Sequence, residues 1–461
     1  MDRAAGHRPL PERERRPAHA GGEVTAFSRA AAVLVAVGVG LAATPLPAEA
    51  VGPASGIRSA TNEQCTADTK VTQTPPALET LQSDAAWALT RGAGVTVAVV
   101  DSGIAANPHL DAVVVPGVNL VPDGTDGSGR TDQYGHGTVI AGQIAAQTIA
   151  GSGVQGLAPA AKILPIRVYA GVSDQVREAG FGPSTARMAE GIRAAADRGA
   201  QIINVSMSTT EKNGALADAV AYAAERGSLV VASAGNRDSD AAVEIDENDG
   251  PRYPAGFSGA IGVAATGTEG TVTQASIHGT HVRLAAPGQQ IASTWPLGGD
   301  CVVAANEPAT SYAAAYVSAA AALVASAHPD ETPAQWAYRL EATAVRAQPD
   351  ARSNTSGWGV VQPYDAIVLV PGSGLRGPQS PFATGTPTAT PTATPGAVAV
   401  VIGPGPDAET ILTATGIGLA GLVALGGIGV LAVYVSRRRE ETSPRRQPPP
   451  GRGLYGREAG E

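Results

Sequence analysis

Apolar residues in the middle of the chain occur in short runs that alternate with longer, Ala-rich stretches. The short runs are apolar at nearly every position and rich in Val and Ile, which predicts strands buried on both faces. Helical spacing in the longer stretches predicts helices, the first of them with Trp87 on its apolar face. We expect strands at 95–100, 162–168, 201–205, 228–232, 260–264 and 281–285, and helices at 78–90, 136–147, 184–198, 214–226, 311–327 and 333–344. Strands and helices that alternate in this way predict an α/β domain with a mostly parallel central sheet.

Three short motifs place reactive side chains at the ends of these elements. Asp101 ends an apolar strand, His136 follows Gly135 at the start of a helix, and Ser311 opens the Ala-rich helix 311–327. A nucleophilic serine needs a base within hydrogen-bonding reach, and that base needs an orienting carboxylate. Each motif alone is an ordinary turn or helix cap, but the order Asp, His, Ser is that of subtilisin. We therefore predict that Asp101, His136 and Ser311 form a catalytic triad.

Residues 78–365 resemble the subtilase superfamily. Besides the three motifs, the segments 156–168, 204–208, 232–236 and 285–288 match stretches of that family. The resemblance implies a subtilisin-like three-layer domain and makes Asn236 the side-chain donor to the oxyanion. It also implies a substrate pocket lined by Ser206, Met207, Ser208, Ala234 and Gly235. The loops 170–183 and 237–252 are expected to modify this pocket. An esterase is disfavoured because Ser311 has no surrounding Gly-x-Ser-x-Gly motif.

Two residues depart from the family pattern near the nucleophile. Ala309 stands where subtilases usually have Gly, and Ala315 stands where they usually have Pro. A Cβ at 309 restricts the backbone beside the oxyanion site. Ala315 favours a straight helix, since Ala has a higher helix propensity than Pro. Neither change removes a reacting atom, so we expect an active enzyme.

The remaining ionisable side chains have ordinary interpretations. We expect turn, surface or capping roles for His109, His278, His281 and His328, and loop positions for Asp111, Asp123, Asp126 and Asp132. None of the histidines has a partner at metal-ligand spacing. We therefore predict no metal and no cofactor; calcium binding, which the resemblance to other subtilases allows, is the alternative.

The N-terminal 50 residues have the layout of a secretory signal. Arginines precede an apolar run at 30–43, and Ala48 and Ala50 then form a small-residue cleavage site. An N-terminal membrane anchor is the alternative, but 14 residues are short for a span.

A second apolar run, at 411–435, has no charged residue. At about 1.5 Å per residue it reaches roughly 37 Å, more than the ~30 Å hydrocarbon core of a bilayer. Three arginines follow at 437–439, which by the positive-inside rule places the tail 436–461 in the cytoplasm. We predict a transmembrane helix at 410–435 after a Pro/Thr-rich linker at 371–409. The alternative, a buried core helix, fits poorly between a Pro-rich linker and a polar tail.

Charge and cysteine content agree with an exported domain. The net charge of −9 comes from the part between the two basic ends, and an acidic domain argues against a nucleic-acid partner. The two cysteines, Cys65 and Cys301, are most simply one disulfide in an oxidising compartment. They are too few for a zinc site.

Within the subtilases, this architecture resembles that of the mycosins, proteases associated with type VII secretion. The resemblance implies that residues 51–77 form an extension that wraps a peptidase domain at 78–370 and is held by the Cys65–Cys301 disulfide. The expected function is a single-pass, membrane-anchored serine endopeptidase that cleaves exported proteins outside the membrane. The alternative is a catalytically weak component that caps or stabilises a membrane secretion complex.

Overall fold

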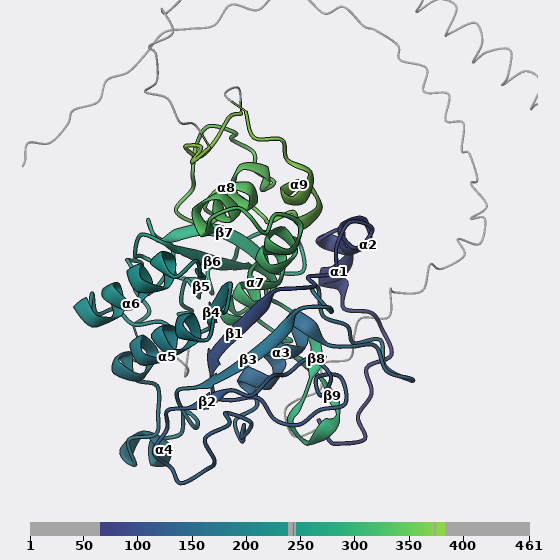
Figure 1. The fold of residues 1–461 in the computed structure, drawn as a ribbon, viewed down its shortest axis with the longest axis vertical. Helices are drawn as coiled ribbons and strands as arrows, with labels where there is room; N and C mark the ends of the chain where they lie inside the picture. The colour runs from purple at the N-terminus through teal and green to yellow at the C-terminus, as the bar shows by residue number, and fades with distance from the viewer. Residues whose placement is uncertain (1–64, 238–242, 244–245, 373–374, 383–461) are drawn as a thin grey trace, which may run out of the picture. The chain divides into compact units, whose positions relative to one another are not determined.

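The structure, a computed structural model, describes residues 65–237, 243, 246–372 and 375–382. Its centre is a parallel sheet with the strand order β2-β3-β1-β4-β5-β6-β7 (Figure 1). The strands are β1 (Thr96–Asp101), β2 (Val118–Asn119), β3 (Lys162–Arg167), β4 (Ile202–Val205), β5 (Leu229–Ser233), β6 (Ala260–Thr266) and β7 (Val282–Pro287). Because β1 lies between β3 and β4, the strand that carries Asp101 is inside the sheet.

Helices cover both faces of this sheet. The helices α5 (Thr185–Asp197) and α6 (Gly214–Glu225) lie on one face, and α3 (His136–Ala145) and α7 (Thr310–Ala327) lie on the other (Figure 1). Alternate residues of β1 join two separate hydrophobic clusters. Val97 and Val99 pack with residues of α3 and α7, whereas Ala98 and Val100 pack with residues of α5 and α6. The α/β, three-layer fold with a parallel sheet is therefore confirmed.

Local sequence signals explain where the helices begin. The side chain of Ser184 accepts the N–H of Arg187 at the start of α5, and Asn213 caps α6 in the same way. Thr332 and Gln335 form a capping box at the start of α8 (Pro333–Thr343). These caps satisfy N–H groups that have no acceptor within the helix.

The expected helix 78–90 is wrong. Two short helices occupy this region, α1 (Pro76–Thr80) and α2 (Ser83–Trp87), separated by Gln82 in the left-handed conformation with φ +51°. The Gln82 side chain donates to Gln362 Oε1 at 2.8 Å, a contact 280 residues away in the chain. The break between α1 and α2 is therefore stabilised by Gln362, a residue distant in the sequence.

Several short elements were not expected from the sequence. They are α4 (Asp174–Glu178), the antiparallel hairpin of β8 (Ile291–Thr294) and β9 (Asp300–Val303), the 3₁₀ turn η2 (Pro296–Gly298) and α9 (Pro363–Val368). Each is too short to produce a periodic pattern of apolar residues.

The two ends of the chain can be followed only in part. The predicted signal peptide, transmembrane helix and tail lie outside the described residues, as does most of the predicted linker. At the start of that linker, the ring of Phe382 lies 5.8 Å from the ring of Tyr338 in α8. Among the described helices, α7 is long and apolar enough to cross a membrane, but most of it is buried in the domain.

Candidate active site

Asp101 and His136 form a buried pair at the carboxyl end of β1. The imidazole Nδ1 lies 2.8 Å from Asp101 Oδ1 and 3.0 Å from Oδ2. Asp101 is fully buried, and His136 is 9% exposed. A carboxylate only accepts hydrogen bonds, so Nδ1 carries the proton and Nε2 is left as the basic nitrogen. Burial by itself lowers the pKa of His136, but the charge of Asp101, the hydrogen bond to it and the charge of Asp132 raise that pKa above its usual value.

Asp132 holds the turn that presents His136. Its Oδ1 accepts the N–H of Gly135 at 2.7 Å and the Ser102 hydroxyl at 2.9 Å, and its Oδ2 accepts the Thr138 N–H and hydroxyl at 2.9 and 2.6 Å. Gly135 has φ +94°, a conformation that favours glycine. We expected an ordinary loop acid at 132, but this side chain is 5% exposed, and burial raises its pKa against these hydrogen bonds. The sequence gives no sign of this, because Asp132 stands in a loop with several other acids.

Tyr169 is a third group at the Asp101 carboxylate, and the sequence analysis missed it. Its hydroxyl donates to Asp101 Oδ1 at 3.0 Å, and the residue is fully buried just after β3. Burial, and then the negative charge of Asp101, raises the pKa of Tyr169 well above its usual value. A polar-tipped aromatic directly after a strand that neighbours β1 was the available signal.

The buried Arg167 at the end of β3 supports the turn after Asp101. Its Nε donates to the carbonyl of Ser102 at 3.1 Å, and its Nη2 lies 2.6 Å from Asp123 Oδ2. Burial raises the pKa of Asp123, but the hydrogen bonds from Arg167 and Thr125 outweigh it and lower that pKa to about 2. Asp123 is therefore ionised at neutral pH.

Ser311 lies in the first turn of α7, beside this pair. Its side chain is nearly buried, its carbonyl accepts the Ser206 hydroxyl at 3.1 Å, and the ring of the next residue, Tyr312, lies 5.5 Å from the His136 ring. Gln143 of α3 also donates to the Tyr312 carbonyl at 3.1 Å. Among the described residues, Ser311 Oγ forms no hydrogen bond with His136. Nucleophile–base hydrogen bonds are often long before substrate binds.

Asn236 lies against Thr310, the residue before Ser311. Its Oδ1 accepts the backbone N–H of Thr310 at 2.8 Å. The Thr310 and Ser233 hydroxyls also share a hydrogen bond of 2.6 Å. The segment after β5 is therefore joined directly to the start of α7, and the NH₂ group of Asn236 is left available to a ligand.

The predicted pocket residues differ in what they can offer a substrate. Met207 packs in the core cluster of α5 and α6, and Ala234 is fully buried, so only their backbones are available. The Ser206 hydroxyl donates to the Ser311 carbonyl, and Ser208 and Gly235 lie close together.

His281 was expected at the surface or in a capping role, but it is 3% exposed and its Nε2 lies 3.0 Å from the carbonyl of Ala234. Burial lowers the pKa of His281 to about 4, so it is neutral and donates this bond.

A hollow of about 600 Å³ lies beside Tyr134, a neighbour of His136. Its lining includes Tyr134, whose ring stacks at 6.1 Å on the ring of His136. Residues 170–174 also line the hollow, and they belong to the loop that was expected to modify substrate binding.

A family model described as the Subtilase family matches residues 92–359. The chain belongs to the subtilase family. It is 39% identical to thermitase of Thermoactinomyces vulgaris, over 53% of this chain and 80% of thermitase. It is 32% identical to Mycosin-3 of Mycobacterium tuberculosis, over 79% of this chain and 84% of that protein. The protein is therefore a subtilisin-type serine endopeptidase related to the mycosins.

Solved mycosin structures resemble this subtilase. One is the MycP3 protease from the type VII (ESX-3) secretion system, with a TM-score of 0.57 and 30% identity over 66% of this chain and 92% of that one. Another is MycP1 from Mycobacterium smegmatis, with a TM-score of 0.57 and 28% identity over 68% of this chain and 91% of that one.

The two departures from the subtilase pattern fit the backbone without strain. Ala309 has φ −121° and ψ 135°, an extended conformation open to any residue, and its N–H donates to the Gly288 carbonyl at 2.9 Å. Ala315 is fully buried within α7, which runs unbroken from Thr310 to Ala327. A straight helix was expected from Ala at this position.

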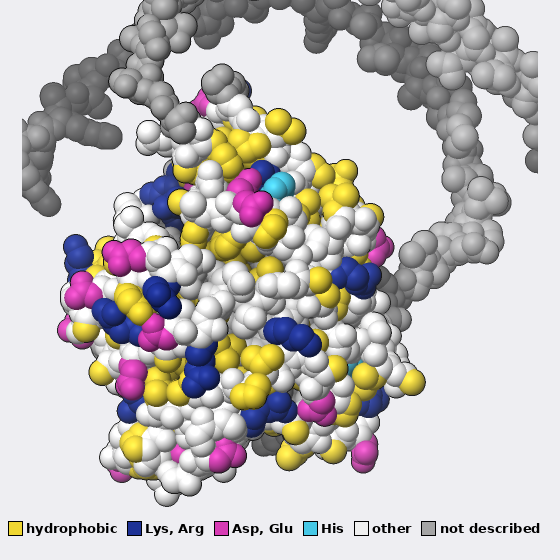
Figure 2. All heavy atoms as spheres, viewed as in Figure 1, with side chains coloured by type: hydrophobic (Ala, Val, Ile, Leu, Met, Phe, Trp, Pro, Cys, Tyr) yellow, Lys and Arg dark blue, Asp and Glu magenta, His cyan; other side chains and the backbone are white. Residues whose placement is uncertain are grey.

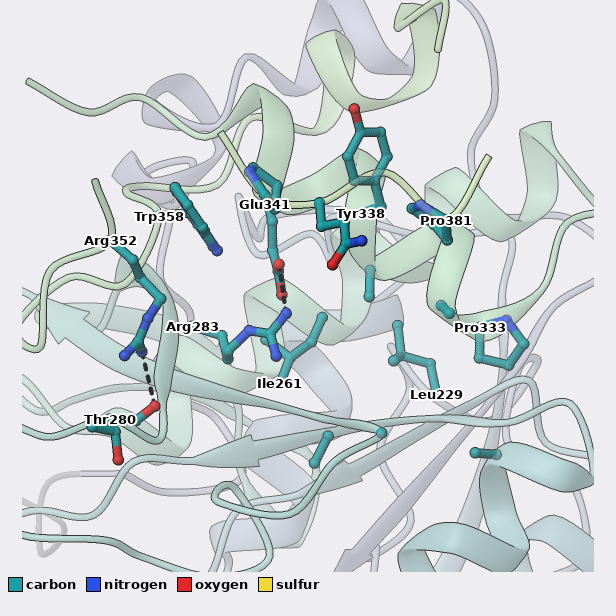
Figure 3. Close-up of a pocket in the computed structure, with 17 residues that line it drawn as sticks. Leu229, Ile261, Thr280, Arg283, Pro333, Tyr338, Glu341, Arg352, Trp358 and Pro381 are labelled. Atoms are coloured by element: carbon teal, nitrogen blue, oxygen red, sulfur yellow. Dashed lines mark hydrogen bonds and ion pairs between the residues drawn. The ribbon is translucent and has the colours of Figure 1, made fainter. Parts of the chain in front are cut away.

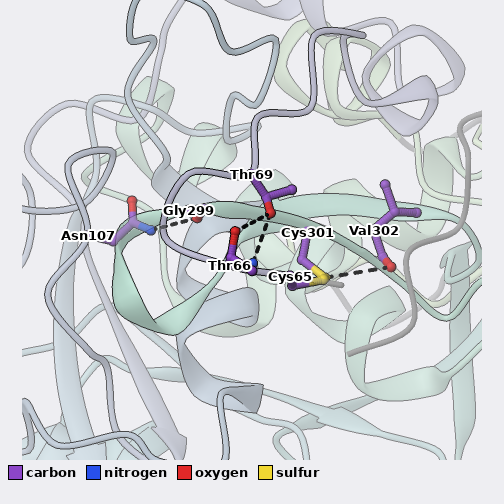
Figure 4. The surroundings of a disulfide bond; sticks show 7 residues. All are labelled: Cys65, Thr66, Thr69, Asn107, Gly299, Cys301 and Val302. Atoms are coloured by element: carbon purple, nitrogen blue, oxygen red, sulfur yellow. Dashed lines mark hydrogen bonds between the residues drawn. A yellow bond between two sulfur atoms is a disulfide. The ribbon is translucent and has the colours of Figure 1, made fainter. Parts of the chain in front are cut away.

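The extension before the subtilase domain is tied to the β8–β9 hairpin. Cys65 and Cys301 form a disulfide with a Cα–Cα distance of 5.4 Å (Figure 4). A Cβ on Gly299 would lie 1.9 Å from the Thr66 carbonyl, so only glycine allows the extension to pass here. Val71 adds two bonds, donating to Asp300 Oδ2 at 3.0 Å and accepting from Gly153 at 2.7 Å.

The β8–β9 hairpin is also hydrogen-bonded to α3, the helix that begins with His136. The hydroxyl of Ser293 donates to the Val139 carbonyl and that of Thr294 to the Thr138 carbonyl, both at 2.7 Å. His109 lies in a turn, as expected, but it is fully buried there, and its Nε2 lies 3.0 Å from Asp300 Oδ1. Extension, hairpin and α3 therefore form one connected unit.

A separate cavity of about 500 Å³ lies at the amino ends of β5 and β6, and its lining residues are drawn in Figure 3. It includes Leu229 and Ala260, the first residues of β5 and β6, and the ion pair of the partly exposed Arg283 with the buried Glu341 at 2.7 Å. Asp101 lies at the carboxyl end of β1, with His136 and Ser311 beside it, so this cavity at the amino ends of β5 and β6 is not part of their site. On the face drawn in Figure 2, basic and acidic side chains are interspersed.

Proposed function

We propose that this subtilase cleaves peptide bonds with Ser311 as nucleophile, His136 as general base and Asp101 as orienting carboxylate. The observation that carries the proposal is the buried Asp101–His136 hydrogen bond of 2.8 Å beside the first turn of α7. That bond fixes the tautomer in which Nε2 can accept the Ser311 proton. The raised pKa of His136 favours the imidazolium that forms when it does.

The reaction then follows from the positions of the donors. Ser311 Oγ attacks the substrate carbonyl carbon while His136 Nε2 takes its proton, and the carbonyl oxygen becomes an oxyanion. The Asn236 NH₂ group and the Ser311 N–H, in the first turn of α7, stabilise this charge. His136 gives the proton to the departing amine, and water hydrolyses the acyl-enzyme by the same steps.

Labelling with a fluorophosphonate tests this triad. The probe should bind Ser311 of the purified domain covalently, and a peptide library should be cleaved by the same preparation. Ser311→Ala should abolish both signals and serves as the control. Labelling at a different residue, or cleavage that survives in Ser311→Ala, would contradict the assignment.

We further propose that the enzyme acts outside the membrane, anchored by 410–435, on proteins exported by a type VII secretion system. The support is the 32% identity to Mycosin-3 and the resemblance to a protease from the type VII (ESX-3) secretion system. In right-side-out vesicles, added protease should cut within 383–409 and release a domain that retains activity. A tag after Glu461 should stay protected. A tag cleaved from outside would reverse the orientation.

A second candidate is a structural component that caps a secretion complex. It is favoured by the lack of a hydrogen bond between Ser311 Oγ and His136 among the described residues. Export assays separate the two candidates. If Ser311→Ala restores export in cells that lack the gene, the structural role suffices. If export fails although the variant reaches the membrane, proteolysis is required.

A further inference from the structure

The end of β3 brings Tyr169 to the catalytic carboxylate. In the parallel register, Asp101 of β1 lies opposite Arg167 of β3, and the Val168 N–H donates to the Asp101 carbonyl at 2.9 Å. The chain leaves the sheet at this point. Tyr169 is fully buried, and its hydroxyl lies 3.0 Å from Asp101 Oδ1 and 3.5 Å from His136 Nδ1.

The three donors to Asp101 are distributed unevenly. Oδ1 accepts from the Ser102 N–H at 2.8 Å, from His136 Nδ1 at 2.8 Å and from the Tyr169 hydroxyl at 3.0 Å. Oδ2 accepts only from His136, at 3.0 Å, among the described residues. The Tyr169 hydroxyl must donate, because an ionised carboxylate has no proton to give. Tyr169 and His136 therefore share one carboxylate oxygen.

We propose that Tyr169 is a positioning residue that fixes the Asp101 carboxylate and limits the basicity of His136. A neutral donor draws negative charge from Oδ1 and so weakens the stabilisation of the imidazolium beside it. It also holds the carboxylate plane toward Nδ1. The proposal rests on the triad proposed above and adds a residue to it.

The surroundings of His136 contain few other titratable groups among the described residues. Asp101 comes from β1, Asp132 from the loop before α3 and Tyr312 from α7, while Tyr134 stacks on the imidazole and contacts the Tyr169 ring edge-on at 6.0 Å. The Arg167 guanidinium is occupied by Asp123 and the Ser102 carbonyl. Among these groups, Tyr169 is the phenol whose hydroxyl donates to Asp101 Oδ1.

Tyr169→Phe removes only the hydroxyl and tests the proposal. We expect kcat to fall by about 10–150-fold, the range for losing a hydrogen bond to a charged group, with KM nearly unchanged. The low-pH limb of kcat/KM should move to higher pH, because a more basic His136 stays protonated up to a higher pH. The NMR resonance of the His136 Nδ1 proton should shift, and its titration should move upward as well. Equal activity and an unchanged pH limb would overturn the proposal.

A matched control removes another tyrosine hydroxyl that donates to a carboxylate, far from His136 in the fold. Tyr222 on α6 donates to Asp197 at the surface, so Tyr222→Phe should leave kcat, the pH limb and the resonance unchanged. Replacing Tyr169 with a fluorotyrosine keeps its volume and strengthens the donor, so the pH limb should move to lower pH. If Tyr169→Phe does not fold, the pH limb of the fluorotyrosine variant tests the proposal instead. A purely structural role predicts no shift from fluorination and would overturn the proposal.

The NMR readout also separates this proposal from the triad itself. The Nδ1 proton reports the hydrogen bonds at Asp101 without any turnover. If Ser311 fails to label but the resonance responds to Tyr169→Phe, the triad proposal fails and the role of Tyr169 at Asp101 stands. If Ser311 labels and neither pH limb nor resonance responds, only the role of Tyr169 fails.

Discussion

The side-chain carbonyl of Asn236 accepts the backbone N–H of Thr310 at 2.8 Å, and this bond orients the amide. With its oxygen held by the residue before Ser311, the amide can offer only its NH₂ group to a substrate. Asn236 follows β5 by three residues, and Thr310 begins α7. The pair therefore joins the sheet to the helix of the nucleophile at the point where the oxyanion would form.

Substitutions at Asn236 can separate its role as acceptor for the Thr310 N–H from its proposed role as donor to the oxyanion. Asn236→Ala should lower kcat by roughly 10²–10³ with little change in KM, because the donor acts mainly in the transition state. Asn236→Asp retains an acceptor for Thr310 but loses the donor, so its kcat should fall at least as far. Steady-state kinetics on a peptide substrate gives both values. If Asn236→Asp keeps wild-type kcat, the amide serves only to hold Thr310.

Removing the nucleophile should affect activity and not folding. Ser311→Ala should lower kcat by about six orders of magnitude, as for other triad nucleophiles. The hydroxyl has no hydrogen-bond partner among the described residues, and a hydroxyl at a helix N-terminus contributes at most about 1–2 kcal/mol. Thermal unfolding should therefore remain close to that of the wild type. Unchanged peptide hydrolysis would remove Ser311 from the mechanism.

The raised pKa of His136 predicts the pH dependence of catalysis. A general base must be neutral, and a raised pKa keeps His136 protonated up to a higher pH. The activity kcat/KM should therefore fall as pH decreases through a value above 6.5, the usual pKa of histidine. Asp101→Asn removes the charge that stabilises the imidazolium and should move this limb downward, with a large loss of kcat. A wild-type limb below pH 6.5 would contradict the assignment of His136.

The disulfide should stabilise the extension and the hairpin together. It closes a loop across 236 residues, which corresponds to about 5 kcal/mol of loop-closure entropy. Cys65→Ser should lower the melting temperature and expose the chain before α1 to protease, while the core still folds. Non-reducing mass spectrometry should give one peptide pair that contains Cys65 and Cys301 in the wild type.

A control for this change comes from the second attachment of the extension. Val71 is held by Asp300 without the disulfide, so Asp300→Asn should weaken the same docking while both sulfurs stay bonded. Equal protease sensitivity of the wild type and Cys65→Ser would show that the backbone contacts alone hold the extension.

The sequence predicted the sheet, its parallel direction and the principal helices, because these depend on local patterns. A strand buried on both faces must be apolar at nearly every position, and Val97 to Val100 shows this directly. The Asp, His and Ser motifs were recognisable for a similar reason. Each stands at the end of a periodic element, so its place at one edge of the sheet follows from the topology.

The tertiary structure decided which polar side chains support these three. Asp132 looks like any acid in a polar loop, and Tyr169 looks like the end of a strand, until the fold buries one under Gly135 and the other against Asp101. The same holds for the buried contact of His109 with Asp300 and for the break at Gln82. A hydrogen bond between residues far apart in the chain leaves no periodic trace in the sequence. Its partners are determined only when packing has fixed the distance between them and removed the water that would otherwise satisfy each.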